Sequence, residues 1–179
     1  SDNGGLVFQK TMATGHRPSD IYRGGKNQIY EGGHRVPFIV TWPGKIAAAS
    51  TSNALLSGTD ILRTLAEVTG QKLAPTQAMD SYSFLPLLQN STEASPRKQL
   101  LLQGGTGREV IIREGDWKLI IQYAKDGSNQ PKALFDLSDN LTENDVGNLI
   151  ESPQQQQRVE RMYQTYNSIR KEKQRTGSR

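Results

Sequence analysis

The sequence predicts an α/β chain in two parts: the edge of a larger α/β domain over residues 1–90, and a smaller α+β part over residues 91–179. Three observations support this prediction. The first part shows only one strand pattern and one helix pattern after a long loop, which cannot close into a domain. Residues 98–137 show four β-rich runs with hairpin connections. The chain then ends in an amphipathic helix pattern. We therefore expect a small antiparallel four-stranded sheet covered by a C-terminal helix.

The first part opens with a long loop. Residues 1–35 are rich in Gly, Asn, Ser and charged residues and have no sustained hydrophobic period. Loops of this length in compact domains are usually functional or disordered. The apolar, β-branched run from Val36 to Trp42 ends at Pro43-Gly44, which predicts a short buried strand.

A helix follows in "GTDILRTLAEVTG". Thr59 or Asp60 can cap its N-terminus, and Gly70 ends it. Its apolar residues recur at helical spacing and lie on one helical face: Ile61, Leu62, Leu65 and Val68. The later run "SYSFLPLLQN" predicts a short apolar segment that packs on a core.

The second part contains the predicted sheet. "KQLLLQGG" predicts a strand, and "EVIIREGDWKLIIQY" predicts a hairpin that turns at Gly115. "KALFDLSDN" predicts a further strand and turn. The terminal helix is predicted to be capped by Ser152, with Pro153 at its first position. Its apolar stripe consists of Val159, Met162, Tyr163, Tyr166 and Ile169.

Composition excludes several classes of chemistry. The chain has no cysteine, which excludes disulfides, thiol catalysis and a cysteine-ligated zinc site within these 179 residues. Its net charge of +4 lies in the last segment, because residues 151–179 hold seven Lys or Arg and three Asp or Glu. The basic segment has no base-reading motif, so we expect no nucleic-acid partner. No apolar run approaches the ~18 residues of a membrane span, so we expect no membrane segment.

The opening motif "SDNGG" places a carboxylate and an amide side by side. Asp2 and Asn3 are hard oxygen donors, which suit Ca²⁺ or Mg²⁺ better than zinc. An Asx turn explains the same residues, because Asp-Asn-Gly is common turn chemistry. Both interpretations stay open for this motif taken alone.

A second motif favours an anionic ligand. "YRGGKNQIYEGGHRVP" places Lys26 between two Gly-Gly pairs, with Glu31 between the lysine and the second pair. Glycines allow close approach of backbone, and a lysine ammonium is a compact positive charge. A solvated loop with a surface lysine is the alternative.

In order along the chain, "SDNGG", "RGGKNQIYEGGHRVPFIVTWPGKI", "SGTDILRTLAEVTG", "MDSYSFLPLL", "REGDWKLI" and "ALFDLSDN" resemble the C-terminal part of type I, formylglycine-dependent sulfatases. These enzymes belong to the alkaline phosphatase superfamily. The resemblance implies that the first part is the edge of the large α/β sulfatase domain. It also implies that Asp2 and Asn3 bind Ca²⁺, and that Lys26 is the catalytic and substrate-binding lysine that holds the sulfate group.

The family's nucleophile motif is absent from this chain. In the family, a Cys or Ser within Cys/Ser-x-Pro-x-Arg matures to formylglycine, and no residue here fits that pattern. We therefore expect the chain to be the C-terminal portion of a longer enzyme, with the N-terminal portion as its partner in one active site. The resemblance further implies a periplasmic or secreted enzyme that acts on a sulfated small molecule or glycan.

Other residues are weaker candidates for the same site. His16 lies between the two motifs, and Arg108 and Arg113 come from the predicted sheet, so each is a possible substrate contact. "GGTGR" at residues 104–108 could form an anion nest, although a wide turn explains it as well. We expect the remaining motif residues to support the lysine loop: Gly24, Gly25, Glu31, Gly32, Gly33 and Arg35.

The expected function is hydrolysis of sulfate esters by the intact enzyme, with Ca²⁺ and formylglycine, and no turnover by this chain alone. Two alternatives remain. One is a non-catalytic module that binds an acidic polysaccharide or a partner chain. The other is a phosphatase, phosphodiesterase or phosphonate hydrolase of the same superfamily.

Overall fold

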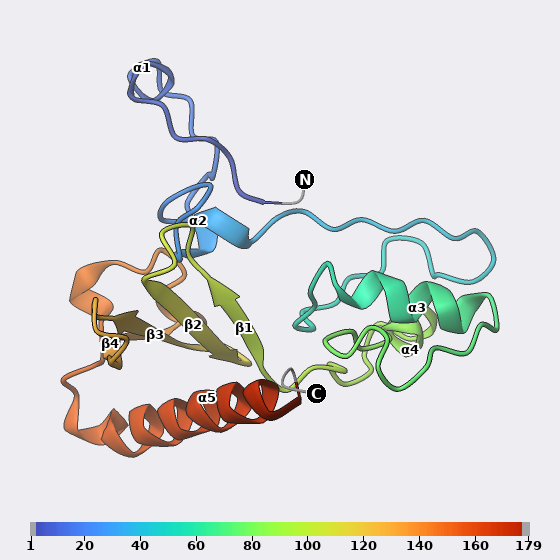
Figure 1. Ribbon diagram of the computed structural model, residues 1–179. Coiled ribbons are helices and arrows are strands. Elements are labelled where there is room, and N and C mark those ends of the chain that lie inside the picture. Colours follow the sequence, from blue (N-terminus) through green and yellow to red (C-terminus); the bar gives the residue numbers. More distant parts are fainter. Residues whose placement is uncertain (1–2, 177–179) are drawn as a thin grey trace. The chain divides into compact units, whose positions relative to one another are not determined.

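The computed structural model describes residues 3–176, with side chains through residue 172 (Figure 1). The chain forms two compact units, which are described separately. The sheet unit contains residues 1–37 and 101–179, and the α3 unit contains residues 38–100. The boundary expected near residue 90 concerns the intact enzyme and stays a prediction.

The sheet unit is built on four strands in the order β1-β2-β3-β4. They are β1 (Leu100–Gln103), β2 (Glu109–Glu114), β3 (Trp117–Tyr123) and β4 (Asn129–Asp136). β2 pairs antiparallel with β3, and β3 pairs antiparallel with β4. This confirms the predicted four-stranded sheet.

The β2–β3 turn lies where the sequence places it. Glu114 pairs with Trp117, and Gly115 between them has φ +57°, a conformation that glycine adopts without the strain of a Cβ. β4 begins at Asn129, three residues before the predicted run. The β3–β4 register shifts between Ile120 and Ile121, where β4 contains Pro131, which has no N–H to donate.

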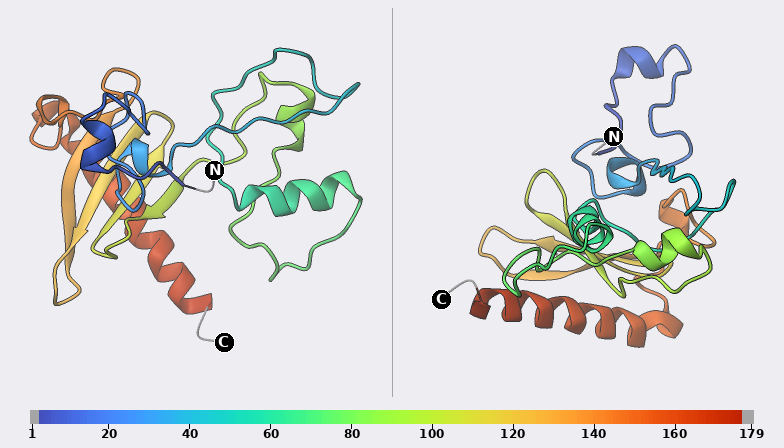
Figure 2. Two further views of the ribbon diagram at one scale, coloured as in Figure 1. Left: turned by 90° about the horizontal axis from the view of Figure 1, so that it is seen from above. Right: turned by 90° about the vertical axis from the view of Figure 1, so that its right-hand side faces the viewer.

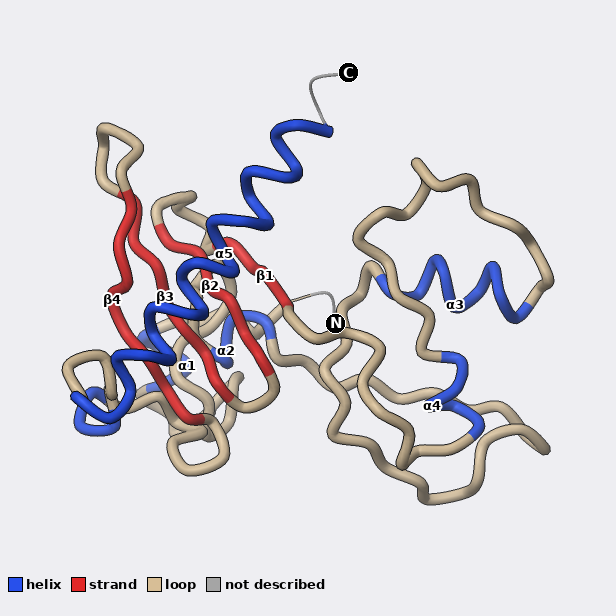
Figure 3. The backbone as a smooth tube through the Cα atoms, turned by 90° about the horizontal axis from the view of Figure 1, so that it is seen from below, coloured by secondary structure: helices blue, strands red, loops and turns tan. Residues whose placement is uncertain are grey.

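Both faces of the sheet are covered. Alternation along β2 and β3 points Ile112 and Leu119 to one face, and Ile111 and Ile120 to the other. Helix α5 (Gln156–Thr176) covers the first face through the predicted stripe, in which Val159, Met162 and Tyr166 are buried and Tyr163 is partly buried. Figure 3 shows α5 crossing the strands obliquely. The predicted covering helix is confirmed.

The opposite face is covered by residues near the N-terminus. Ile29 is buried against Ile111, Ile120 and Phe135, and Tyr30 packs beside them. Figure 2 shows α5 and the N-terminal segment on opposite sides of the sheet. The sheet is therefore the middle layer of this unit, and the loop that carries the candidate lysine is one of its outer layers.

The start of α5 differs from the prediction. A 3₁₀ turn, η2 (Pro153–Gln155), precedes the helix, and a second such turn, η1 (Asp145–Gly147), follows β4. Ser152 makes no capping bond to a backbone N–H. Its hydroxyl instead donates to the Gln154 side chain at 2.9 Å, so the predicted cap is wrong in detail.

The long N-terminal loop contains two short helices, α1 (Gln9–Met12) and α2 (Glu31–His34). Residues 6–17 are exposed throughout. Gly32 and Gly33, in contrast, are buried. The part of the loop near α2 is thus built into the sheet unit.

The predicted strand from Val36 to Trp42, which lies mostly in the α3 unit, is wrong for this structure. These residues have no regular secondary structure, and Ile39 is 87% exposed. Phe38 contacts Phe84 edge to face, at 5.5 Å between ring centroids. A strand needs a neighbour for its N–H and C=O groups, and no described segment pairs with this run.

Helix α3 (Asp60–Val68) is confirmed, and Gly70 follows it with φ +70°. The apolar face of this helix is not its buried face. The apolar stripe is exposed, with Leu62 at 56% and Leu65 at 55%, whereas Asp60, Thr64 and Ala66 are buried. Helix α4 (Leu85–Gln89) follows and buries Leu87 beside Phe84, as expected for a packed apolar segment.

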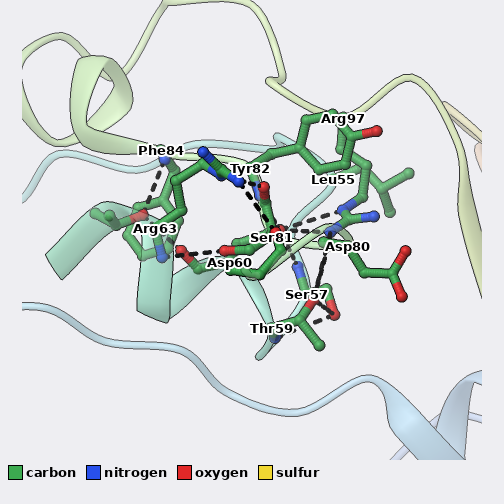
Figure 4. A network of polar contacts seen from close by, with 12 residues as sticks. Leu55, Ser57, Thr59, Asp60, Arg63, Asp80, Ser81, Tyr82, Phe84 and Arg97 are labelled. Carbon is green, nitrogen blue, oxygen red and sulfur yellow. Dashed lines mark hydrogen bonds and ion pairs between the residues drawn. The ribbon is translucent and has the colours of Figure 1, made fainter. Parts of the chain in front are cut away.

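A polar network explains which side of α3 is buried (Figure 4). The Asp60 carboxylate accepts hydrogen bonds from the backbone N–H of Ser57 at 2.8 Å and of Tyr82 at 2.9 Å. It also forms a buried ion pair with Arg97, which donates to the Asp80 carbonyl at 2.7 Å. A buried carboxylate needs such partners. The Asp60–Arg97 pair therefore turns this side of the helix inward.

Within residues 3–176, no helix combines the length and the apolar character needed to cross a membrane.

Candidate functional site

The two sequence motifs are joined by backbone hydrogen bonds. Gly4 N–H donates to the Gly33 carbonyl at 2.9 Å, and Lys26 N–H donates to the Gly5 carbonyl at 2.9 Å. We call residues 23–33 the Lys26 loop. These bonds hold the Asn3–Gly5 segment beside that loop, although more than twenty positions separate the two motifs in the sequence.

Glycines make this close packing possible. A Cβ atom on Gly33 would lie 2.0 Å from the Gln28 carbonyl oxygen, and one on Gly4 would lie 1.8 Å from the Gly32 carbonyl oxygen. No side chain fits at such distances. Gly24, Gly25 and Gly32 also have backbone or side-chain atoms within 2.6 Å of a would-be Cβ. The glycines bring backbone against backbone within the protein.

Lys26 itself is exposed. Its backbone is fixed by the bond to Gly5, but its ammonium makes no hydrogen bond or ion pair with the residues that the structure describes. Asn27, the next residue, has φ +71° and marks the turn of the loop. The loop thus presents a positive charge to solvent from a firmly hydrogen-bonded backbone.

Glu31 lies at the other end of the loop and is fully buried. Four cationic or ionisable side chains surround its carboxylate. Lys118 Nζ and His34 Nε2 lie 3.1 Å from Oε1, while Arg113 lies 2.9 Å and Arg35 3.3 Å from Oε2. Glu31 therefore joins the Lys26 loop to β2 and β3.

A second carboxylate completes this arrangement. Glu143, also fully buried, lies 2.7 Å from Lys118 Nζ through Oε1 and accepts the Glu31 N–H at 2.5 Å through Oε2. Its backbone carbonyl accepts from Arg23 at 2.8 Å, and Arg23 also pairs with Asp145 at 2.7 Å. We call Glu31, Lys118 and Glu143, with Arg113 and Arg23, the charge cluster.

Sequence reasoning missed Lys118 and Glu143. One signal was available for Lys118: a lysine inside the apolar run "WKLII" faces the interior if its neighbours follow strand alternation. Glu143 lies in a polar turn with φ +50° and gives no local signal.

Burial and charge act in opposite directions on Glu31. Burial alone would raise the pKa of its carboxyl group, but the His34 hydrogen bond and the charges of Lys118 and Arg113 lower it well below its ordinary value. The carboxylate therefore stays ionised in the folded protein under mildly acidic conditions.

This shift predicts acid sensitivity. Because the Glu31 pKa is depressed by folding, its stabilisation is complete above the unfolded value near 4.5 and decreases as pH falls toward the folded value. Below that value, the free energy of unfolding should fall by up to about 1.4 kcal/mol per pH unit through this one group. Urea unfolding at several pH values, followed by the β3 amide signals, measures it. Glu31→Gln should make the plot of unfolding free energy against pH less steep, by the amount that corresponds to one proton. Parallel slopes for both proteins would contradict the assignment.

An open pocket of about 200 Å³ lies beside the Lys26 loop. The "GGTGR" turn borders it, because Gly105 N–H donates to the Asn27 carbonyl at 2.8 Å. Its lining combines apolar side chains with several amide side chains. The lining residues are Asn3, Asn27, Gln28, Ile29, Gly33, His34, Leu102, Gln103, Gly105 and Ile111.

The weaker candidates occupy different places. His16 is exposed on the N-terminal loop. Arg108 is exposed at the end of the "GGTGR" turn, near the pocket. Arg113 bonds to Glu31 and to the Gly115 carbonyl at 2.9 Å, which favours support of the charge cluster over contact with substrate. Arg35, expected to support the loop, also lies in contact with Glu31.

The predicted metal ligands are only partly described. Asp2 lies outside the described residues, and Asn3 lies at the pocket. Between residues 3 and 176 no three His, Cys, Asp or Glu side chains gather in a way that could hold a metal ion. Hard oxygens from Asp2 and Asn3 suit Ca²⁺ in kind, but Ca²⁺ takes about six to eight ligands, so these two would supply only part of a site.

The family model described as "N-sulphoglucosamine sulphohydrolase, C-terminal" matches residues 24–172. The chain belongs to this sulfatase C-terminal family. The matched range includes the Lys26 loop from residue 24 onward, the sheet and most of α5, so the predicted resemblance to sulfatases is confirmed.

Curated relatives agree with this sulfatase family. An N-acetylgalactosamine-6-O-sulfatase of Bacteroides thetaiotaomicron is 34% identical over 156 residues, which cover 77% of this chain and 30% of the relative. Arylsulfatase A of Bos taurus is 33% identical over 176 residues, which cover 85% of this chain and 32% of the relative. The chain thus spans about a third of the length of these sulfatases.

Solved structures share the fold of this sulfatase C-terminal chain. One, described with the metabolism of multiple glycosaminoglycans by Bacteroides thetaiotaomicron, has a TM-score of 0.77 at 30% identity. The match covers 94% of this chain and 37% of the chain of that structure. Another was solved in complex with its substrate D-glucosamine-2-N,6-O-disulfate and has a TM-score of 0.65 at 24% identity. The match covers 80% of this chain and 30% of the chain of that structure. At that identity the second likeness shows the fold alone.

Proposed function

We propose that this chain is the C-terminal portion of an enzyme that hydrolyses sulfate esters, in which Lys26 binds the sulfate group. The nucleophile, a formylglycine made from Cys or Ser, comes from the N-terminal portion of the same enzyme. Asp2 and Asn3 contribute ligands to Ca²⁺, which supplies positive charge against the sulfate oxygens when bound.

One observation supports this proposal above the others. Hydrogen bonds at 2.9 Å from Gly4 to Gly33 and from Lys26 to Gly5 hold the Asn3 segment and the Lys26 loop together. The Lys26 backbone therefore lies beside the Asn3–Gly5 segment, and its exposed side chain has no hydrogen-bond or ion-pair partner among the described residues. An anionic substrate is the natural partner for such a charge.

The chemistry of sulfate ester cleavage fits this arrangement. Negative charge builds on the departing oxygen and stays on the sulfuryl oxygens during the reaction. A cation that is already in position stabilises the transition state more than the ground state. The hydrogen-bonded backbone of the Lys26 loop supplies that positioning.

We infer that the substrate is a sulfated carbohydrate, with an aryl sulfate as the less favoured class. The 34%-identical relative is named as an N-acetylgalactosamine-6-O-sulfatase, and the lining of the pocket beside Lys26 includes amide side chains that can exchange hydrogen bonds with hydroxyl groups. His16 and Arg108 are exposed and are the candidate contacts to the rest of the substrate. The intact enzyme is expected in the periplasm or outside the cell.

The test uses the intact enzyme that carries this chain. It should release sulfate from an aryl or carbohydrate sulfate and should prefer that ester over the matching phosphate ester. This chain alone should show no turnover, because it contains no Cys and no Ser within the nucleophile motif. Preference for phosphate would favour the phosphatase alternative. Glycan binding without turnover by the intact enzyme would favour the non-catalytic module.

A further inference from the structure

We propose that Lys118 and Glu143 are positioning residues for Lys26, and that the charge cluster holds both ends of the Lys26 loop in one place. Neither residue lies in the "SDNGG" motif or in the Lys26 loop, which carry the proposed site residues. The proposal rests on the proposed function only for its catalytic readout, because the structural part can be tested on this chain alone.

The first step of the argument is the burial of Lys118. Its side chain, near the start of β3, is fully buried between Glu31 at 3.1 Å and Glu143 at 2.7 Å. Taking an ammonium and two carboxylates out of water is costly, and apolar residues of similar volume often stabilise a fold as well. A buried triad of this kind therefore suggests a role in selecting one geometry.

The second step is the role of Glu143 at both ends of the loop. At the start of the loop, Arg23 donates to the Glu143 backbone carbonyl at 2.8 Å. At its end, the Glu31 N–H donates to the Glu143 carboxylate at 2.5 Å. Lys118 pairs with the other oxygen of that carboxylate. One residue thus fixes the two ends between which Lys26 lies.

The third step connects the ends to Lys26 itself. Gly32 N–H donates to the Arg23 carbonyl at 2.9 Å, and Gln28 N–H donates to the Gly25 carbonyl at 2.9 Å. With its ends fixed and these bonds inside it, the loop has little freedom to move the Lys26 backbone. A catalytic group must be held within a fraction of an ångström of its productive position. The charge cluster supplies this constraint by connecting the loop to β2, β3 and Glu143.

Hydrogen exchange on the full 179-residue chain tests the structural part. Lys118→Met should accelerate exchange of the protected amides of Lys26, Gln28, Gly32 and Gly33 by about tenfold or more, because opening of the loop costs less without the triad. The β3–β4 amides should keep their protection. Lys132→Met is the matched control, since Lys132 also pairs with a glutamate, Glu109, at 2.7 Å, but its side chain is 42% exposed.

Glu143→Gln serves as a second variant in case Lys118→Met does not fold. It removes the charge that pairs with Lys118 but keeps the shape, and it should accelerate the same loop amides. Wild-type exchange of these amides in a folded variant would overturn the proposal, as would equal acceleration in the Lys132→Met control.

A double-mutant cycle in the intact enzyme tests the catalytic part. Lys118→Met should lower kcat/KM for a sulfate ester about tenfold, mainly through kcat. In a Lys26→Ala background it should cause no further loss, since Lys118 acts through Lys26. If Lys118→Met lowers kcat/KM by the same factor in the Lys26→Ala background as in the wild type, its effect is general structural damage, and the proposal is overturned. If the intact enzyme cleaves no sulfate ester, the proposed function fails, while the exchange experiment still decides whether the cluster holds the loop.

Discussion

Lys26→Ala in the intact enzyme should lower kcat/KM for sulfate ester hydrolysis by about 10²–10³, the usual cost of removing one preorganised group that stabilises transition-state charge. Lys26 is exposed and its ammonium forms no hydrogen bond or ion pair with a described residue, so its removal should leave thermal stability nearly unchanged. Steady-state kinetics on an aryl sulfate, with a melting curve for each protein, measures both quantities.

Two variants sharpen this prediction. Lys26→Arg should recover little activity, because a planar guanidinium cannot replace a compact ammonium in a tight loop. Lys125→Ala removes another exposed lysine of the sheet unit, in the turn between β3 and β4, and should leave kcat/KM unchanged. Near-normal activity of Lys26→Ala would show that this loop is not where sulfate binds.

The second large effect concerns stability of the α3 unit. Arg97→Met should destabilise this unit by about 3–5 kcal/mol, because it leaves the buried Asp60 carboxylate without its cation. The Asp60 side chain is fully buried, and its Arg97 partner is 8% exposed. Amide exchange of α3 should accelerate accordingly, while the β3 amides of the sheet unit should not change.

Matched variants separate the ion pair from other effects. Lys98→Met alters the next residue along the chain, which is exposed, and should change stability by less than about 0.5 kcal/mol. Combining Arg97→Met with Asp60→Asn should recover part of the loss, because no unpaired charge is then buried. If Arg97→Met leaves α3 as protected as in the wild type, the polar network does not determine how this helix packs.

Much of the sheet unit could be predicted from the sequence. The two β-rich runs in "EVIIREGDWKLIIQY" predicted both strands, and Gly115 predicted their turn. The stripe of Val159, Met162 and Tyr166 predicted that the last helix covers a face. These features are local: each depends on residues within about one turn of a helix or a few positions of a strand, so periodicity alone records them.

The candidate site was predicted in part. The glycine pairs around Lys26 predicted close approach of the loop backbone to an anionic ligand, and the structure joins that loop to the Asn3 segment. The structure instead assigns the close approach to protein backbone, as at Gly33 and Gln28. Nothing local predicted that Glu31 would meet Lys118, 87 positions away, or that Glu143 would accept its N–H across 112 positions.

The sequence by itself determined which residues of each element share a face; only the tertiary structure decided which face is buried. The apolar stripe of α3 is exposed because the Asp60–Arg97 pair turns the opposite side inward, and residues 36–42 form no strand because no described segment pairs with them. Periodicity reflects neighbours along the chain. Burial and ion pairing depend on neighbours in space, and these come from segments that no local pattern connects.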